Sequence, residues 1–339
     1  MAANPTVRTL ARSLGLSRST VSNALRGGTR TAPATVQRVL AAARAASYQH
    51  NPLAASLMSE MRRSRGGKFR GVLAAIDLYE PGQIPHGVFH REVVRGASVR
   101  ARELGFKLEE FVVGRGGLTM QRLDSILQSR GINGLLLLPS WIAPDYSALD
   151  WSRYAGAYTD YNQSLPDLHT FTGDHYRSIM LTLMRLHAKG YRRPGLVIES
   201  GRNERLDRRH SSAFQAYTED QGAKTPPVPP LIAPEISQAL FAQWFRRHKP
   251  DVVLCHATNV LDWMEACGAR LPEKHGFVCL NLAFKTRPCA GLDMQPDLIG
   301  ARGIEFVIAQ LHRNERGVPT SPTRTTIRSV WVDGPTVRA

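Results

Sequence analysis

The chain has 339 residues, of which 42% are hydrophobic, and it carries a formal net charge of +16. No apolar run approaches the roughly 18–20 residues of a membrane span, and the N-terminus lacks the apolar stretch of a signal peptide, so we expect a soluble, cytoplasmic protein with no membrane partner. The four cysteines (Cys255, Cys267, Cys279 and Cys289) form no C-x-x-C pair, which favours reduced thiols over a zinc site or a disulfide framework.

The positive charge is concentrated at the N-terminal end. Residues 1–70 contain twelve lysines and arginines and a single acidic residue, Glu60, so eleven of the sixteen net positive charges lie there. The other 269 residues are nearly balanced, with 32 basic and 27 acidic side chains. A charge imbalance confined to one end is typical of a surface that binds a polyanion, and the pattern inside it indicates DNA.

Two short helices and a glycine turn are predicted at the start of the chain. Apolar residues recur at helical spacing over residues 7–14, directly after Thr6, which is placed to cap the helix. Gly15 ends this pattern, because glycine accepts the positive φ of a tight turn, and Ser17 is placed to cap a second helix over residues 18–25. Helix, glycine turn and helix within about twenty residues form the helix-turn-helix pattern.

A third helix is predicted to begin at Pro33 and to pack on the first two. The expected inward side chains are Val21, Ala24 and Leu25 of the second helix and Val36, Val39, Leu40 and Ala43 of the third.

The second helix of this unit is predicted to lie in the major groove of DNA. It carries short polar side chains and one arginine, which can reach base edges, and a basic loop follows it that suits phosphates. The candidate DNA contacts here are Thr6, Ser17, Arg18, Ser19, Thr20, Ser22, Asn23, Arg26 and Arg30. The alternative is a small helical bundle whose arginines are only solvated, but that alternative does not explain the near absence of acidic residues.

These residues resemble a known family. The segments TVRTLARSLGLSRSTVSNALRGG and TVQRVLAAARAASYQHNPLAASL are similar to the DNA-binding headpiece and hinge of the LacI/GalR transcriptional regulators. The resemblance implies a headpiece over residues 1–50 and a hinge helix and linker over residues 51–67. It also implies DNA contacts by Asn51, Ala54 and Leu57, with Leu57 as an apolar wedge that unstacks a base step in the minor groove. Asn23 and Arg26 depart from the residues usual in the family, so a known operator sequence cannot be transferred.

The rest of the chain, residues 68–339, predicts an α/β core. Continuous apolar runs such as GVLAAI, GLLLLP, GLVIE and DVVLCH alternate with helical stretches, which indicates parallel sheets covered on both faces. This length is too great for one such sheet, so we expect two lobes with a ligand beyond the carboxyl ends of the strands. The family resemblance implies a periplasmic-binding-protein-like core of two Rossmann-like lobes that serves for effector binding and dimerisation. The N-lobe would span about 68–163 and 293–322, and the C-lobe about 164–292 and 323–339.

Polar residues at the predicted strand ends are the candidates for effector binding: Asp77, Trp141, Asp160, Tyr161, Arg208, His210, His256 and Asn281. Ser140, Arg205 and Arg209 lie beside them in the sequence. The resemblance places Asp160 at a cleft aspartate of the family and His210 where many members have an arginine. Ala257 stands where they keep an aspartate, so a familiar sugar effector does not follow directly.

Other chemistry has weaker signals. Gly114–Gly117 follows a strand as a phosphate loop would, but it lacks the further residues of known fingerprints and reads as a connecting turn. His86 and His90 have the i, i+4 spacing of a metal pair, although Pro85 and Gly87 argue against a helix there. No G-x-S-x-G motif is present and no cysteine has a recognisable base partner, so we expect neither an enzyme nor a cofactor or metal.

The sequence therefore predicts a homodimeric transcriptional regulator, a repressor, that binds a pseudo-palindromic double-stranded operator under the control of a small-molecule effector, a sugar or sugar derivative. Two alternatives remain open at this point: a sequence-tolerant architectural DNA-binding protein, and an enzyme on an α/β core with an appended DNA-binding domain. The sequence does not indicate the effector, the operator or the sign of the response to effector, and it favours a dimer over a tetramer without deciding between them.

Overall fold

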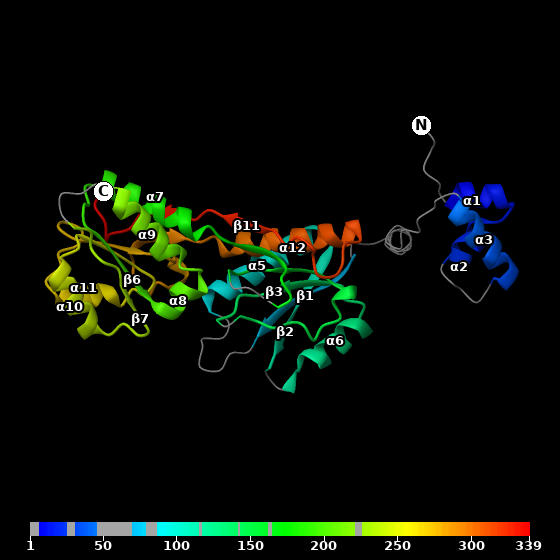
Figure 1. Ribbon diagram of the computed structural model, residues 1–339, viewed down its shortest axis with the longest axis horizontal. Coiled ribbons are helices and arrows are strands. Elements are labelled where there is room, and N and C mark those ends of the chain that lie inside the picture. Colours follow the sequence, from blue (N-terminus) through cyan, green and yellow to red (C-terminus); the bar gives the residue numbers. More distant parts are fainter. Residues whose placement is uncertain are drawn as a thin grey trace. The chain divides into compact units, whose positions relative to one another are not determined.

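The computed structural model describes residues 7–25, 31–45, 70–78, 87–114, 117–141, 143–161, 165–220 and 226–339 (Figure 1). The chain separates into two compact units, Met1–Gly67 and Lys68–Ala339.

The first unit contains three helices, α1 (Val7–Leu14), α2 (Arg18–Leu25) and α3 (Pro33–Ala45). Gly15, at the turn between α1 and α2, has φ +64°, as the turn requires. The small core consists of Leu10, Ala11, Val21, Ala24, Val39 and Ala43. The three predicted helices and the glycine turn are confirmed, while the predicted inward residues Val36, Leu40 and Leu25 are only partly buried.

The core contains two six-stranded sheets. The first sheet has the order β11-β5-β4-β3-β1-β2 and is parallel throughout. Its strands are β1 (Gly71–Leu78), β2 (Phe106–Val113), β3 (Gly134–Leu137), β4 (Ala155–Tyr158), β5 (His169–Gly173) and β11 (Arg324–Ile327). We call this sheet with its helices the N-lobe; the helices are α5 (Val88–Glu103), α6 (Met120–Ser129), the 3₁₀ turn η2 (Trp151–Arg153) and α12 (Pro296–Arg313).

The second sheet has the order β12-β10-β9-β8-β6-β7, and only the β10–β12 pair is antiparallel. Its strands are β6 (Pro194–Glu199), β7 (Leu231–Ala233), β8 (Val252–Cys255), β9 (Gly276–Cys279), β10 (Ala290–Asp293) and β12 (Val330–Val332). We call this sheet with its helices the C-lobe; the helices are α7 (His175–Ala188), α8 (Ser200–Arg205), α9 (Arg209–Asp220), α10 (Gln238–His248), α11 (Val260–Ala266) and the 3₁₀ turn η3 (Leu282–Phe284).

The central strands β3, β4, β8 and β9 are buried along their whole length. Burial on both faces explains why they are apolar runs without alternation. Each lobe accordingly has apolar clusters on the two faces of its sheet. The prediction of two Rossmann-like lobes is confirmed.

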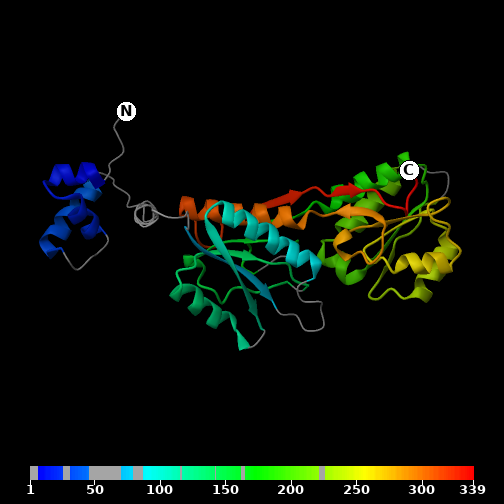
Figure 2. The same cartoon turned by 180° about the vertical axis from the view of Figure 1, so that it is seen from behind.

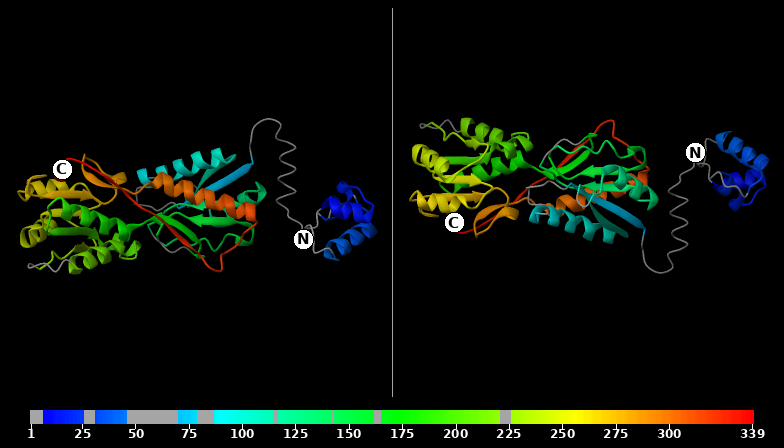
Figure 3. Two further views of the ribbon diagram at one scale, coloured as in Figure 1. Left: turned by 90° about the horizontal axis from the view of Figure 1, so that it is seen from above. Right: turned by 90° about the horizontal axis from the view of Figure 1, so that it is seen from below.

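The chain crosses between the lobes three times, after β5, between β10 and α12, and between β11 and β12, as the green, orange and red segments of Figure 3 show. The predicted lobe boundaries at 163/164 and 322/323 were therefore wrong by one strand each, because β5 and β11 pair within the first sheet. The sequences of these two strands, HTFTG and RTTI, are too polar to stand out as apolar runs.

Helices α5 and α12 pack side by side on one face of the N-lobe sheet, cyan and orange in Figure 2. Two glycines permit this close approach. A Cβ atom at Gly300 would overlap the carbonyl oxygen of Val93, and one at Gly96 would overlap that of Asp297. Any larger residue would force the helices apart.

Candidate functional site

The first unit presents α2 in the arrangement that the sequence predicted. The Ser17 hydroxyl accepts a hydrogen bond from the backbone N–H of Thr20 (3.1 Å) and so caps the N-terminus of α2. Within residues 7–25 and 31–45 there are five arginines and no acidic residue. These two ranges therefore supply no carboxylate that could neutralise the arginines, which suits the binding of an external anion.

Asn23 is less free than the sequence suggested. It is half-buried, and its side-chain amide donates a hydrogen bond to the Thr31 hydroxyl (3.2 Å), which ties α2 to the residues before α3. The side chains of Arg18, Ser19 and Ser22 lie outside what the structure describes, although their backbone belongs to α2. The other predicted contacts lie outside the described residues altogether: Thr6, Arg26, Arg30, Asn51, Ala54 and Leu57.

In the core, a cavity of about 480 Å³ lies between the two lobes. Several of the residues that line it come within four residues after the end of a parallel strand. Ser140 and Trp141 follow β3 and Asp160 follows β4 in the N-lobe, whereas His256 follows β8 and Asn281 follows β9 in the C-lobe. This is the edge at which ligands bind in open α/β sheets.

A buried ion pair bridges the lobes in this cavity. Arg205 on α8 donates through Nη2 to Asp160 Oδ2, and its Nε donates to the carbonyl oxygen of Ser140 (2.8 Å). Asp160 also accepts from the backbone N–H groups of Ser140 (3.3 Å) and Tyr161 (2.7 Å). Burial raises the pKa of Asp160, and the opposing effect of Arg205 does not cancel it. Because Arg205 belongs to the C-lobe and Asp160 to the N-lobe, any change in their separation alters this network.

A second arginine, Arg202, occupies a different environment on the same helix. Its guanidinium lies over the Trp141 ring (4.8 Å to the centroid) and near the Phe284 ring (5.5 Å). Burial lowers its pKa, which Glu199 only partly offsets. A guanidinium held between aromatic rings keeps its N–H donors at the ring edges, where a ligand can reach them.

Three histidines, two of which line this cavity, form a row of rings. The His175 and His210 centroids lie 5.1 Å apart, those of His210 and His256 lie 5.0 Å apart, and Tyr161 contacts His175 at 5.7 Å. Burial lowers the pKa of His175 to about 3 and those of His210 and His256 well below their usual value. The buried Nδ1 atoms of all three have no hydrogen-bond partner among the described residues.

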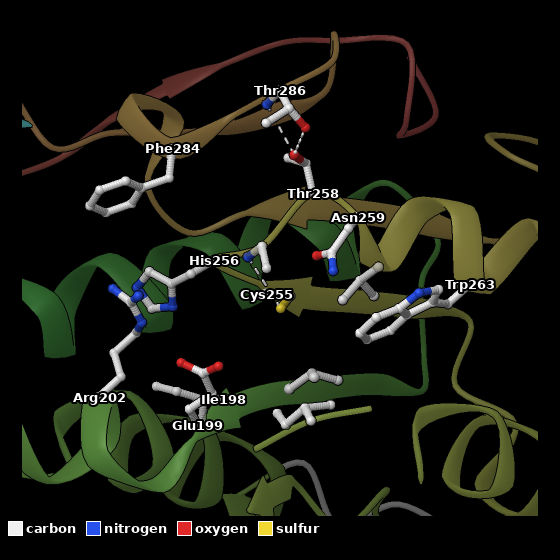
Figure 4. A pocket seen from close by; sticks show the side chains of 14 residues that line it. Ile198, Glu199, Arg202, Cys255, His256, Thr258, Asn259, Trp263, Phe284 and Thr286 are labelled. Carbon is white, nitrogen blue, oxygen red and sulfur yellow. Dashed lines mark hydrogen bonds between the residues drawn. The ribbon is translucent and has the colours of Figure 1, made fainter. Parts of the chain in front are cut away.

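A second cavity of about 320 Å³ lies within the C-lobe and shares residues with the first. Figure 4 shows Arg202 and Phe284 at one end of this cavity, Trp263 at the other, and Cys255 between them. Thr258 and Thr286 are hydrogen-bonded through their hydroxyls (2.7 Å) at its border. Burial raises the pKa of the Cys255 thiol to about 11, so this cysteine is a neutral wall residue rather than a nucleophile.

The structure thus brings together four of the eight predicted effector residues, Trp141, Asp160, His256 and Asn281. Asp77, Tyr161 and His210 are buried but do not line the cavity, and Tyr161 and His210 lie next to it through the row of rings. Arg208 is placed elsewhere: it is exposed in the turn between α8 and α9, with φ +56°, and borders a different surface depression. The prediction that Arg208 contacts the effector was wrong, because the turn carries the chain from the cavity wall to the outer face.

Sequence reasoning missed Arg202, His175 and Phe284. The i, i+3 spacing of Arg202 and Arg205 was a usable signal, because it places both on one helix face. It was not recognised because the short helix α8 directly after β6 was not expected.

The other predicted chemistry gained no support. Among the residues that the structure describes, no three His, Cys, Asp or Glu side chains are grouped to hold a metal ion. His90 is hydrogen-bonded to the carbonyl oxygen of Pro139 (2.7 Å), and His86 lies outside the described residues. Gly114 donates to the carbonyl oxygen of Leu118 (2.8 Å), as in a connecting turn. Across the described ranges, every helix is too short or too polar to span a bilayer.

The core and the whole chain are similar to known proteins. Residues 183–331 match the periplasmic binding protein-like domain family. No curated protein sequence matches the chain. Among solved structures, the transcriptional regulator CelR in complex with cellobiose is 17% identical, with a TM-score of 0.60, and covers 98% of this chain and 99% of its own.

Two further solved structures have a similar fold. The Lac repressor dimer bound to operator and the anti-inducer ONPF is 15% identical, with a TM-score of 0.57 and 99% coverage of both chains. A LacI-family regulator from Rhizobium etli is 14% identical, with a TM-score of 0.61, and covers 79% of this chain and 99% of its own. The resemblance seen in the sequence is therefore confirmed: the chain has the fold of the LacI-type transcriptional regulators, with a periplasmic-binding-protein-like core.

Proposed function

We propose that the chain is a transcriptional regulator, acting as a repressor, whose affinity for a DNA operator is controlled by a small-molecule effector bound between the lobes. The observation that carries this proposal is the cavity at the strand ends, whose polar groups come from both lobes and are linked by Arg205 and Asp160. A ligand that contacts both walls favours one separation of the lobes over another, and such differential binding is what shifts a conformational equilibrium.

The DNA-binding part of the proposal rests on α2 and its surroundings. A capped helix in a unit whose described arginines have no acidic neighbours suits the major groove of a duplex. The protein acts as a homodimer on a pseudo-palindromic operator, with one first unit on each half-site. Leu57 would be the wedge in the minor groove, with Asn51 and Ala54 beside it. Thr6, Arg26 and Arg30 would contact the phosphate backbone of the DNA.

In the core, the effector contacts Trp141, Asp160, His256 and Asn281. A sugar or sugar derivative as the effector is supported by the structurally similar regulator CelR, which was solved in complex with cellobiose. The protein works by binding rather than by catalysis, in the cytoplasm.

Selection of duplexes from a random library, followed by titration of the selected and of random DNA between 50 and 200 mM salt, tests the DNA-binding part. We expect the selected duplex to bind at least a thousandfold more tightly, on the scale of specific regulators. A steep salt dependence shared equally by selected and random DNA would support the architectural alternative instead.

The effector part is tested with a ligand that changes operator affinity. Asp160→Ala should abolish this change. Operator affinity without ligand is measured in the same variant as the control, because the loss of Asp160 also leaves Arg205 without its carboxylate partner. Recovery of the ligand unchanged after incubation is expected, and its conversion would favour the enzyme alternative.

A further inference from the structure

Arg202 is a charged group of the cavity whose guanidinium has no direct carboxylate partner among the described residues, and Glu199 offsets its charge only in part. Its neighbour Arg205 is engaged by Asp160 and by the carbonyl oxygen of Ser140. The Arg202 guanidinium makes no hydrogen bond or ion pair with the described residues and lies against the Trp141 and Phe284 rings. A partly buried guanidinium without a polar partner is costly unless something else satisfies it.

Toward the cavity between the lobes, the charged side chains near Arg202 are mostly basic, while Glu199 lies on the side of the C-lobe cavity. The cavity between the lobes is lined by Arg91, Arg202, Arg205 and Lys285, and the only carboxylate among its described lining residues is Asp160. Because Asp160 is already paired with Arg205, it does not offset the remaining charge. A cleft lined by one sign of charge with apolar walls concentrates ligands of the opposite sign.

Two ring nitrogens near this charge also have no hydrogen-bond partner. His175 and His256 both line the cavity, and the Nδ1 atom of each is buried without a partner among the described residues. Arg202 and His256 line the same two cavities, so one ligand can reach both side chains. A ligand oxygen placed between Arg202 and His256 would satisfy both.

Arg202 lies where two cavities meet, so there is room on either side for the rest of a ligand. Arg202, His256 and Phe284 line both the cavity between the lobes and the cavity inside the C-lobe (Figure 4). A group bound at Arg202 can therefore belong to a molecule that extends into either cavity.

We propose that the effector carries an anionic group, a carboxylate or a phosphate, which binds the guanidinium of Arg202 between Trp141 and Phe284. The inference rests on the proposed function and narrows its ligand from sugars in general to a sugar acid or a sugar phosphate. The guanidinium matches either group with two parallel hydrogen bonds.

The test uses the full-length protein and inorganic phosphate as the probe, with potassium chloride adjusted to keep the ionic strength constant because the first unit is strongly basic. Binding is followed by calorimetry and by tryptophan fluorescence. We expect Arg202→Gln to weaken phosphate binding at least tenfold, and Arg246→Gln, which removes an exposed charge outside the cavity, to leave it unchanged. Trp141→Phe should remove the fluorescence response. Equal phosphate binding by the wild type and Arg202→Gln would overturn the inference.

Matched ligands then separate the chemical sources. Glucose 6-phosphate and glucuronate are compared with glucose, each by its effect on melting temperature and on operator affinity. We expect the two anions, but not glucose, to raise the melting temperature, and the effect to be lost in Arg202→Gln. If glucose alone stabilises the protein and changes operator affinity, the anionic site is wrong while the proposed regulator stands. If the anions bind through Arg202 but operator affinity never changes, the site stands and the effector control of the proposed function fails.

Discussion

The two units of this protein differ in how their positive charge is balanced. In the described helices of the first unit, arginines have no acidic residue beside them, and Arg38 bonds only to a backbone carbonyl. In the core, some arginines are matched with carboxylates, for example Arg100 with Glu103 and Glu305, and Arg287 with Asp262 and Glu265. Others, such as Arg193 and Arg338, bond to backbone carbonyl oxygens. A region that lacks carboxylates suits an external polyanion, whereas a region that mixes both signs can balance charge within the fold.

Within the core, the cavity between the lobes contains both kinds of arginine. Arg205 is paired with a buried carboxylate, whereas the Arg202 guanidinium lies between two rings without a polar partner among the described residues. Arg202 is therefore the better candidate for binding an external group, and Arg205 for linking the lobes.

Arg205→Ala tests the paired arginine and has the largest expected effect. It leaves Asp160 buried without its partner, so we expect a loss of about 3 kcal/mol in the free energy of unfolding. Thermal or urea unfolding measures it, and Asp160→Asn in the same chain should recover part of the loss. Arg302→Ala is the matched control, because Arg302 pairs with Glu305 while 56% of its own side chain is exposed, against 16% for Arg205. Equal losses for the two variants would mean that burial does not distinguish the pairs.

Arg18→Ala tests the unpaired charge of the first unit. Arg18 begins α2, so we expect operator affinity to fall about tenfold to a hundredfold and affinity for random duplexes to change little. Fluorescence anisotropy with both duplexes at one salt concentration measures the difference. Arg12→Ala, on α1, should weaken both duplexes alike. Should Arg18→Ala behave in the same way as Arg12→Ala, Arg18 contacts phosphate rather than a base.

The buried histidines give the smallest effect, which depends on pH. His210 on α9 faces His175 on α7, His256 after β8 and Arg202 on α8, and its folded-state pKa is lowered mainly by burial. The unfolded chain takes up a proton below about pH 6.5 while the folded protein does not, so stability falls as the pH drops below that value. We expect His210 alone to account for about 1 kcal/mol between pH 7.5 and 5.5.

Unfolding at both pH values compares the wild type with His210→Phe, in which the pH dependence should be weaker by that amount. The exposed His312→Phe is the control and should keep the full dependence. An unchanged dependence in His210→Phe would show that His210 is protonated in the folded protein.

Much of the fold could be predicted because its signals are local. Gly15 and Ser17 define the turn and cap of the helix-turn-helix, and fully buried strands such as β3 and β8 are continuous apolar runs. The strands that escaped prediction, β5 and β11, are polar and gain their place from neighbours that are distant in sequence. About half of the candidate site was predicted. Residues that follow apolar strands were found, and Arg202 on the unexpected helix α8 was missed.

The sequence by itself determined a basic helix-turn-helix, an α/β core and the strand ends at which polar groups gather, because helical periodicity, apolar runs and charge are properties of neighbouring residues. Only the tertiary structure decided that Arg205 meets Asp160 across the lobes, that Arg202 is left between Trp141 and Phe284, and that Arg208 turns away from the cavity. These outcomes depend on which segments, some 40 to 80 residues apart along the chain, are brought within a few ångströms by sheet pairing, and no local pattern records that distance.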